Sequence, residues 1–169
     1  SFIIPGGFSY GDYLRTGAFA AKSKVMESII EAANKKMPIL GICNGFQILC
    51  EANLLSGALL PNYKGKFLCQ NIDLKVINKK SIFTKKYKKE IVTIPIAHMD
   101  GRYFTSDDDV KNLQDNDQIA FLYHKQNPNG SKSDIAGILN KEKNILGMMP
   151  HPERIIDKDI NGDDGLKLF

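Results

Sequence analysis

Residues 38–52 read PILGICNGFQILCEA, and this stretch decides how the chain folds. Met37 to Ile42 is a short apolar run bounded by proline and glycine, which is typical of a buried parallel strand. The apolar residues that follow recur at helical spacing, namely Phe46, Leu49, Cys50 and Leu54. The pattern therefore predicts a strand that turns sharply into a helix ending near Gly57, with Cys43 at the turn.

Cys43 lies between Gly41 and Gly45, and small neighbours let a backbone bend tightly around a nucleophile. The amino-terminal end of the following helix would favour a thiolate, so the stretch predicts a cysteine with a lowered pKa. The ordinary alternative is a buried structural cysteine. That interpretation suits Cys50 and Cys69, whereas the glycine flanks of Cys43 favour a reactive residue.

The composition is that of an ordinary globular domain, and we expect a single domain spanning residues 1–169. Charged residues make up 25% and hydrophobic residues 43% of the chain, and no apolar stretch is long enough to cross a bilayer. The three cysteines lack metal-type spacing, which argues against a disulfide framework and a zinc site and favours a reducing cytoplasm.

The net charge of +4 comes largely from paired lysines at 79–80, 85–86 and 88–89. Only Tyr87 interrupts this cluster, whereas nucleic-acid binding usually needs aromatic residues among the basic ones. We therefore expect a solvated face.

The first residues, SFIIPGG (1–7), read as the end of a strand that enters a glycine turn. Parallel sheets are assembled from several strand–helix units, so we expect one or two such units to precede residue 1. A polar and aromatic surface loop at 8–16 and a helix over 18–36 should follow, and the helix would cross over to the Cys43 strand. Five later runs read as strands: 71–77, 90–97, 118–123, 134–139 and 144–149.

His151 and Glu153 lie in the stretch GMMPHPER (147–154), two residues apart and between prolines. In an extended segment such residues face the same side. A carboxylate can then orient an imidazole, which can exchange a proton with a thiol and a leaving amine. Together with Cys43, this pair predicts a Cys-His-Glu triad.

Three segments carry a resemblance to a known family: PGG (5–7), GICNGFQ (41–47) and PHPER (150–154). The chain resembles the class I, or triad, glutamine amidotransferases. It is more closely similar to the small glutaminase subunits of phosphoribosylformylglycinamidine synthases, in GGFSYGDYLR (6–15), NPNGS (127–131) with IAGI (135–138), and GMMPHPER (147–154).

This resemblance implies an α/β fold: a three-layer, flavodoxin-like, mostly parallel sheet with helices on both faces. It also implies that Cys43, His151 and Glu153 hydrolyse glutamine to glutamate and ammonia through a glutamyl thioester. The backbone N–H groups of Gly7 and Asn44 would form the oxyanion hole, and the side chain of Gln47 would contact glutamine.

The resemblance further implies partners. A large synthase subunit, with a small bridging subunit in many bacteria, would receive the ammonia and make phosphoribosylformylglycinamidine in purine biosynthesis. No cofactor is expected in this chain, because ATP and magnesium would belong to the synthase subunit. Independently of the resemblance, the solvent-exposed character of the loop from Tyr10 to Arg15 leads us to expect that it contacts that subunit.

Two other functional classes fit parts of the pattern. Cysteine hydrolases and deglycases of related fold typically carry histidine directly after the cysteine, whereas this chain has Asn44. A non-catalytic partner-binding module would be signalled by loss of Cys43, His151 or Glu153, and all three are present. The chain departs from the family pattern at 98–102, where it reads HMDGR and the family commonly has HGEGR.

Overall fold

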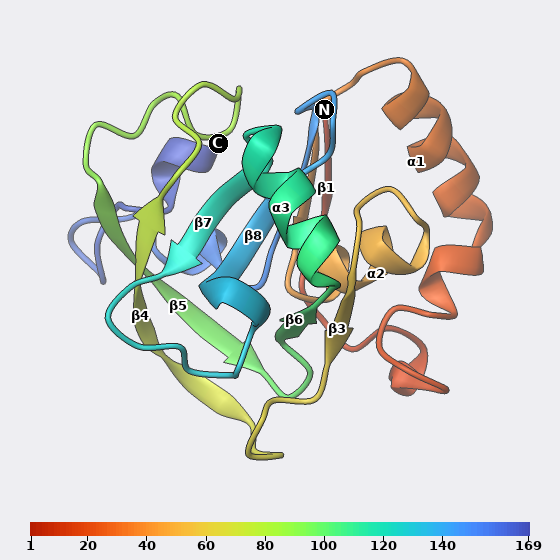
Figure 1. Ribbon diagram of the computed structural model, residues 1–169, viewed down its shortest axis with the longest axis horizontal. Helices are drawn as coiled ribbons and strands as arrows, with labels where there is room; N and C mark the ends of the chain where they lie inside the picture. The colour runs from red at the N-terminus through yellow and green to blue at the C-terminus, as the bar shows by residue number, and fades with distance from the viewer.

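A seven-stranded sheet forms the centre of the computed structural model, which describes residues 1–169 (Figure 1). Its strands, in spatial order, are β1 (Phe2–Ile4), β2 (Ile39–Ile42), β9 (Ile145–Met148), β8 (Ile135–Leu139), β7 (Ile119–Tyr123), β4 (Leu68–Val76) and β5 (Ile91–His98). A separate antiparallel pair joins β3 (Ala58–Leu60) to β6 (Arg102–Phe104). The α-helices are α1 (Lys24–Asn34), α2 (Asn44–Glu51) and α3 (Asp107–Asp115).

The α/β class expected from the sequence is confirmed, but the sheet is mixed and not mostly parallel. Only the pairs β1–β2 and β2–β9 are parallel, and the other pairs are antiparallel. The connections explain this difference. α1 provides the long crossover that parallel neighbours need, whereas β8 and β9 are joined only by the short turn at 140–144.

The predicted helices are shorter in the structure. The segment expected to be helical over 18–36 divides into a 3₁₀ turn, Ala20–Lys22, and α1, because Ser23 between them has an extended backbone. Val25 and Ile30, which share the helical spacing, are exposed, while Met26, Ile29 and Ala32 are buried. α2 ends at Glu51 and not near Gly57, so the apolar residues after it belong to a turn.

Strand β5 lies at the far edge of the sheet from β1, yet its free edge touches the segments that carry the predicted site. Its Pro95 carbonyl accepts a hydrogen bond from the His151 backbone N–H at 2.7 Å, and its Ala97 carbonyl accepts one from the Cys43 thiol at 3.7 Å. The Thr93 N–H on the same edge donates to the Asp164 carboxylate at 2.9 Å. The sheet is therefore curled, and Pro95 is tolerated because no strand needs its missing N–H.

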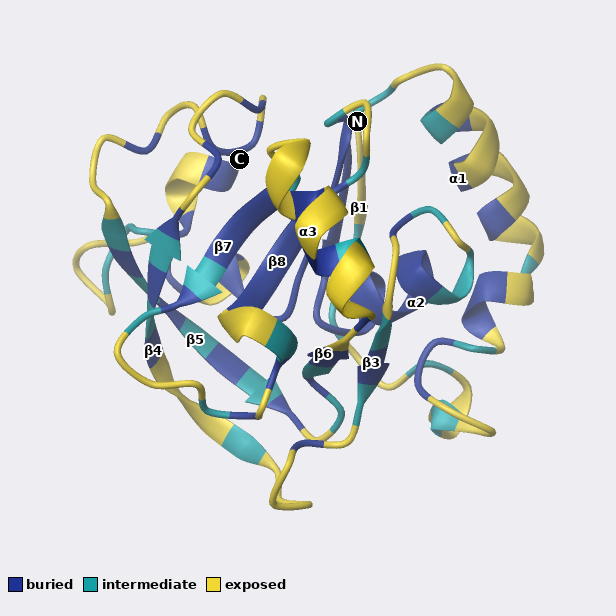
Figure 2. Ribbon diagram, viewed as in Figure 1, coloured by how far each residue is buried: buried dark blue, intermediate teal, exposed yellow.

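The core lies on both sides of this sheet, and Figure 2 shows its strands largely buried while the outward faces of α1 and α3 are exposed. Every residue of β2, β8 and β9 is buried. α2 packs on β1, β2 and β9, which are the three strands in parallel register. None of the helices is long and apolar enough to span a membrane.

Candidate active site

Cys43 occupies the sharp turn between β2 and α2, with φ 51° and ψ −104°. This backbone conformation is costly for a residue with a side chain, and such strain is typical of functional positions. The flanking glycines make the turn possible. A Cβ atom on Gly41 would lie 2.8 Å from the carbonyl oxygen of Gly45, and one on Gly45 would overlap the carbonyl oxygen of Ile4. The helix therefore sits directly against the strands.

The thiol of Cys43 is protonated in this state, contrary to the low pKa expected from the sequence. Cys43 is only 6% exposed, and burial raises the pKa of its thiol to about 11, although the Asn44 N–H and the charge of Arg154 act in the opposite direction. The effect of burial is larger because the thiolate would lose more free energy of hydration than it would gain from the N–H groups at the start of α2. The sulfur consequently needs a base to take its proton.

His151 can provide that base. Its Nδ1 lies 2.6 Å from Oε1 of Glu153, so Nδ1 carries the proton and Nε2 keeps a lone pair. His151 is 3% exposed, and Nε2 has no hydrogen-bond partner within the protein. Burial is the largest single effect and would raise the pKa of Glu153, but the hydrogen bond to His151, the charges of His151 and Arg154 and a backbone hydrogen bond together lower it, so the net shift is downward. The pair has the geometry of an oriented general base.

Gly6 packs between the cysteine and the histidine. A Cβ atom added to Gly6 would lie 2.7 Å from Cε1 of His151 and 3.5 Å from Cβ of Cys43. The structure therefore brings Cys43 and His151 to the same place, although the thiol proton is directed at Ala97 and not at the imidazole.

The predicted oxyanion-hole residues lie beside these side chains. The N–H of Gly7 makes no hydrogen bond within the protein, and the N–H of Asn44 points at the Cys43 sulfur. Gln47 is also at the site, where its Oε1 accepts from Nδ2 of Asn44 at 2.8 Å and its Nε2 donates to the Asp100 carbonyl at 2.6 Å. Gln47 thus ties the turn at Cys43 to the segment that follows β5.

Sequence reasoning missed the contribution of backbone groups, because the carbonyls of Pro95 and Ala97 have no residue-type signature. It also missed the packing of Gly6 and the buried His98, although the HMDGR segment was visible as a departure. No group of three or more His, Cys, Asp or Glu side chains is arranged to hold a metal ion.

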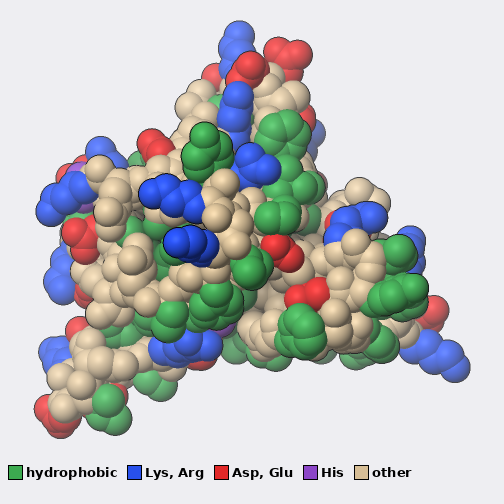
Figure 3. All heavy atoms as spheres, turned by 90° about the horizontal axis from the view of Figure 1, so that it is seen from below, with side chains coloured by type: hydrophobic (Ala, Val, Ile, Leu, Met, Phe, Trp, Pro, Cys, Tyr) green, Lys and Arg blue, Asp and Glu red, His purple; other side chains and the backbone are tan.

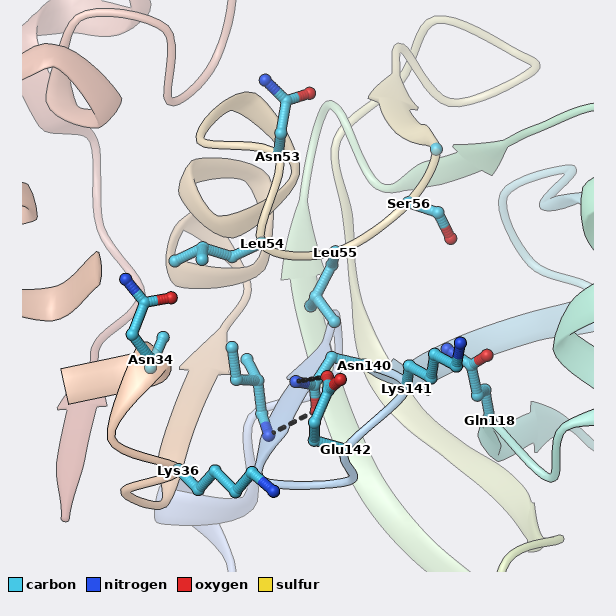
Figure 4. A pocket seen from close by; sticks show the side chains of 13 residues that line it. Asn34, Lys36, Asn53, Leu54, Leu55, Ser56, Gln118, Asn140, Lys141 and Glu142 are labelled. Atoms are coloured by element: carbon cyan, nitrogen blue, oxygen red, sulfur yellow. Dashed lines mark hydrogen bonds between the residues drawn. The ribbon is translucent and has the colours of Figure 1, made fainter. Parts of the chain in front are cut away.

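Two cavities can be compared as binding sites. One of about 290 Å³ lies against Gly6, Gly7, His151 and Glu153. A larger one of about 580 Å³ is lined by the end of α1, the segment after α2 and the turn at 140–142 (Figure 4). Its lining holds amides, lysines and Glu142 but no cysteine or histidine. Of these two cavities, only the smaller one is lined by His151 and Glu153, the residues that form the base.

Comparison with known proteins places this geometry in a family. Residues 1–162 match the model of the CobB/CobQ-like glutamine amidotransferase domain. Among solved structures, the chain is similar to PurLQS from Thermotoga maritima, with a TM-score of 0.90 and 49% identity over 99% of this chain and 75% of that one.

Two more distant structures support the fold alone. The glutaminase domain of CTPS from Trypanosoma brucei has a TM-score of 0.59 and 18% identity, over 99% of this chain and 67% of that one. A glutamine amidotransferase from Thermotoga maritima has a TM-score of 0.58 and 17% identity, over 90% of this chain and 56% of that one. From the match over residues 1–162 and the 49% identical relative, we conclude that the chain belongs to the CobB/CobQ-like glutamine amidotransferase family.

Proposed function

We propose that this protein is the glutaminase component of phosphoribosylformylglycinamidine synthase and that it releases ammonia from glutamine for purine biosynthesis. The similarity to PurLQS over nearly the whole chain supports this assignment. The observation that carries the chemistry is the strained, buried Cys43 packed beside a His151 whose Nε2 lone pair is free.

The reaction begins when the Cys43 sulfur attacks the side-chain amide carbon of glutamine while Nε2 of His151 takes the thiol proton. The N–H groups of Gly7 and Asn44 stabilise the negative oxygen of the tetrahedral intermediate, and losing one such donor typically costs about a hundredfold or more in rate. The carbon–nitrogen bond then breaks, and His151 returns the proton to the leaving nitrogen. Ammonia departs and a glutamyl thioester remains on Cys43.

Water resolves the thioester in the second half of the reaction. His151 takes a proton from water as its oxygen attacks the thioester carbon, and the sulfur leaves and recovers that proton. Glu153 holds the ring in the required tautomer and stabilises its charged form in both halves. Gln47 still has one N–H and one oxygen lone pair available, and we propose that these contact the bound glutamine.

The ammonia is transferred to a large synthase subunit, and ATP and magnesium belong to that subunit in this proposal. A small bridging subunit completes the complex, which we place in the cytoplasm. This chain contributes one amidotransferase domain over residues 1–169.

We further propose that the loop before α1 is the contact with the synthase subunit. Its apolar side chains are largely in solvent: Phe8 is 73%, Tyr10 63%, Tyr13 68% and Leu14 77% exposed. Figure 3 shows hydrophobic side chains at the right, the side on which Figure 1 shows this loop, as well as over the centre of the same face. Exposed apolar residues clustered in this way mark interaction surfaces.

Leu14→Asp tests this contact, with Ile160→Asp as the matched control because Ile160 is 78% exposed in a different segment. Arg15 is unsuitable, since its side chain forms a double hydrogen bond with Glu51, at 2.6 Å for each contact. We expect Leu14→Asp to weaken complex formation at least tenfold while the control does not. Equal affinities for both variants would contradict the contact.

Glutamate release from glutamine tests the function itself. It should be measured with and without the synthase subunit, formylglycinamide ribonucleotide and ATP, with Cys43→Ala as the blank. We expect release that depends on Cys43 and rises with the partner. Glutamine hydrolysis that is undiminished in Cys43→Ala would refute the mechanism, and hydrolysis indifferent to the partner would refute the coupling.

A further inference from the structure

His98, the last residue of β5, has a defined tautomer. Its Nδ1 lies 3.1 Å from Oδ1 of Asn62. The amide nitrogen of Asn62 donates to the carbonyl oxygens of Lys66, at 2.8 Å, and of His98, at 2.9 Å, so Oδ1 is correctly placed as an acceptor. Nδ1 of His98 must therefore be the donor, and Nε2 carries the lone pair.

This lone pair has no partner. His98 is 3% exposed, and its Nε2 is buried without a hydrogen bond. Burial and the neighbouring His151 lower the pKa of His98 to about 4, so the ring is neutral at pH 7. An unpaired acceptor in the interior is unfavourable, and native proteins rarely leave one without a reason.

The ring lies beside the active site and is held in place there. The carbonyl oxygen of the preceding residue, Ala97, accepts a hydrogen bond from the Cys43 thiol. The carbonyl oxygen of Asp100 accepts one from Nε2 of Gln47, which lies in α2 just after the Cys43 turn. A Cβ atom on Gly101 would overlap the His98 ring, so this segment packs directly against the imidazole. His98 is thus a neutral acceptor, held by Asn62 and Gly101 and close to His151, on the segment that contacts the Cys43 turn.

Glutamine brings a group that needs such an acceptor. In the proposed function the N–H groups of Gly7 and Asn44 donate to the side-chain amide oxygen of glutamine, while Nε2 of His151 takes the thiol proton. The two N–H bonds of that amide are then left without an acceptor. Of the other side-chain atoms that are buried without a partner, Ser9 Oγ and Asp12 Oδ1 both belong to the 3₁₀ turn at Ser9–Asp12, and Asp12 is a carboxylate. The remaining lone pair of Gln47 is on an oxygen that already accepts from Asn44, so the Nε2 atom of His98 is the neutral acceptor with no partner in the segment after Ala97.

We propose that Nε2 of His98 accepts a hydrogen bond from the side-chain amide N–H of bound glutamine and so selects an amide over a carboxylate or an ester. This inference rests on the proposed function and names a contact within the same site. Glutamate would place a γ-carboxylate oxygen against the lone pair, so the product would be repelled where the substrate is bound. A site that pairs a substrate N–H discriminates strongly against analogues that lack it.

The test compares His98→Asn with the wild type on three substrates: glutamine, γ-glutamyl methyl ester and glutaramate, which is glutamine without its α-amino group. Asparagine can keep the contact to Asn62 but lacks an acceptor at the Nε2 position. We expect kcat/KM for glutamine and glutaramate to fall about tenfold to a hundredfold, and that for the ester to change less than threefold. His98→Gln should recover part of the loss, and His124→Asn should cause none.

The other outcomes would overturn the inference. An equal loss on all three substrates means that His98 is only structural, and a loss that glutaramate escapes means that Nε2 serves the α-ammonium group. Wild-type protein that does not hydrolyse glutamine even with the synthase subunit, formylglycinamide ribonucleotide and ATP present would instead refute the proposed function. If His98→Asn does not fold, calorimetry on Cys43→Ala decides: we expect glutamine to bind at least tenfold more tightly than glutamate, and equal or tighter binding of glutamate contradicts the proposal.

Discussion

Gly6 has no space for a side chain beside His151, so Gly6→Ala perturbs the site without removing any functional group. Its φ angle is not in the left-handed region, and alanine therefore suits the backbone. The added Cβ would lie 2.7 Å from Cε1 of His151, whereas carbon atoms in contact are about 3.5–4.0 Å apart. The imidazole must move by about 1 Å, away from Gly6 and out of its present position in the site.

A displacement of this size typically costs about a hundredfold in rate, or about 2.7 kcal/mol in the activation barrier. We therefore expect kcat for glutamine hydrolysis to fall about a hundredfold, measured as glutamate release. The control is Gly65→Ala, which carries φ +60° and has no neighbour within 4 Å of its Cβ. It should lose only some stability. A folded Gly6→Ala protein with wild-type kcat would refute the packing argument.

Three other perturbations probe the same geometry. Glu153→Gln should lower kcat about 10²–10⁴-fold, because the amide holds His151 less firmly and does not stabilise its charged form; an unchanged pH–rate profile with full activity would contradict this role. Gly45→Ala should lower the free energy of unfolding by about 1–3 kcal/mol in urea titrations, because its Cβ would overlap the Ile4 carbonyl, and an unchanged midpoint would disprove that contact. Alkylation of Cys43 by iodoacetamide should keep accelerating from pH 7 to pH 9, since its raised pKa of about 11 leaves the thiolate fraction rising with pH; a plateau in that range would show a lower pKa.

The strand–turn–helix around Cys43 could be predicted from residues 38–52. The short apolar run, the glycines on either side of Cys43 and the helical spacing of the apolar residues that follow all indicate it. Strands β3 and β6 could not, since a pair of three-residue strands shows no period. Helix α3 was also missed, because only Val110 and Leu113 are buried along it. Its sequence did contain a signal, the capping residue Ser106, whose hydroxyl accepts from the Asp109 N–H at 3.0 Å.

The active site, like the fold, could be predicted from the sequence only in part. The residue types of Cys43, His151 and Glu153 indicate their chemistry through the sequence alone, and the fold brings them together. The pKa of Cys43 could not be predicted, because it depends on burial by segments distant in sequence. The same is true of the contacts made by the β5 carbonyls and by Gly6, which arise from the curl of the sheet and not from local pattern.

Trapping the covalent intermediate tests the central claim most directly. Protein mixed with glutamine is quenched in acid and digested, and the peptide that contains Cys43 is examined by mass spectrometry. The account predicts one added glutamyl group on Cys43, removable by hydroxylamine as a thioester should be, and absent from Cys43→Ala. Glutamate release with no adduct on Cys43, or with an adduct on another residue, would contradict it.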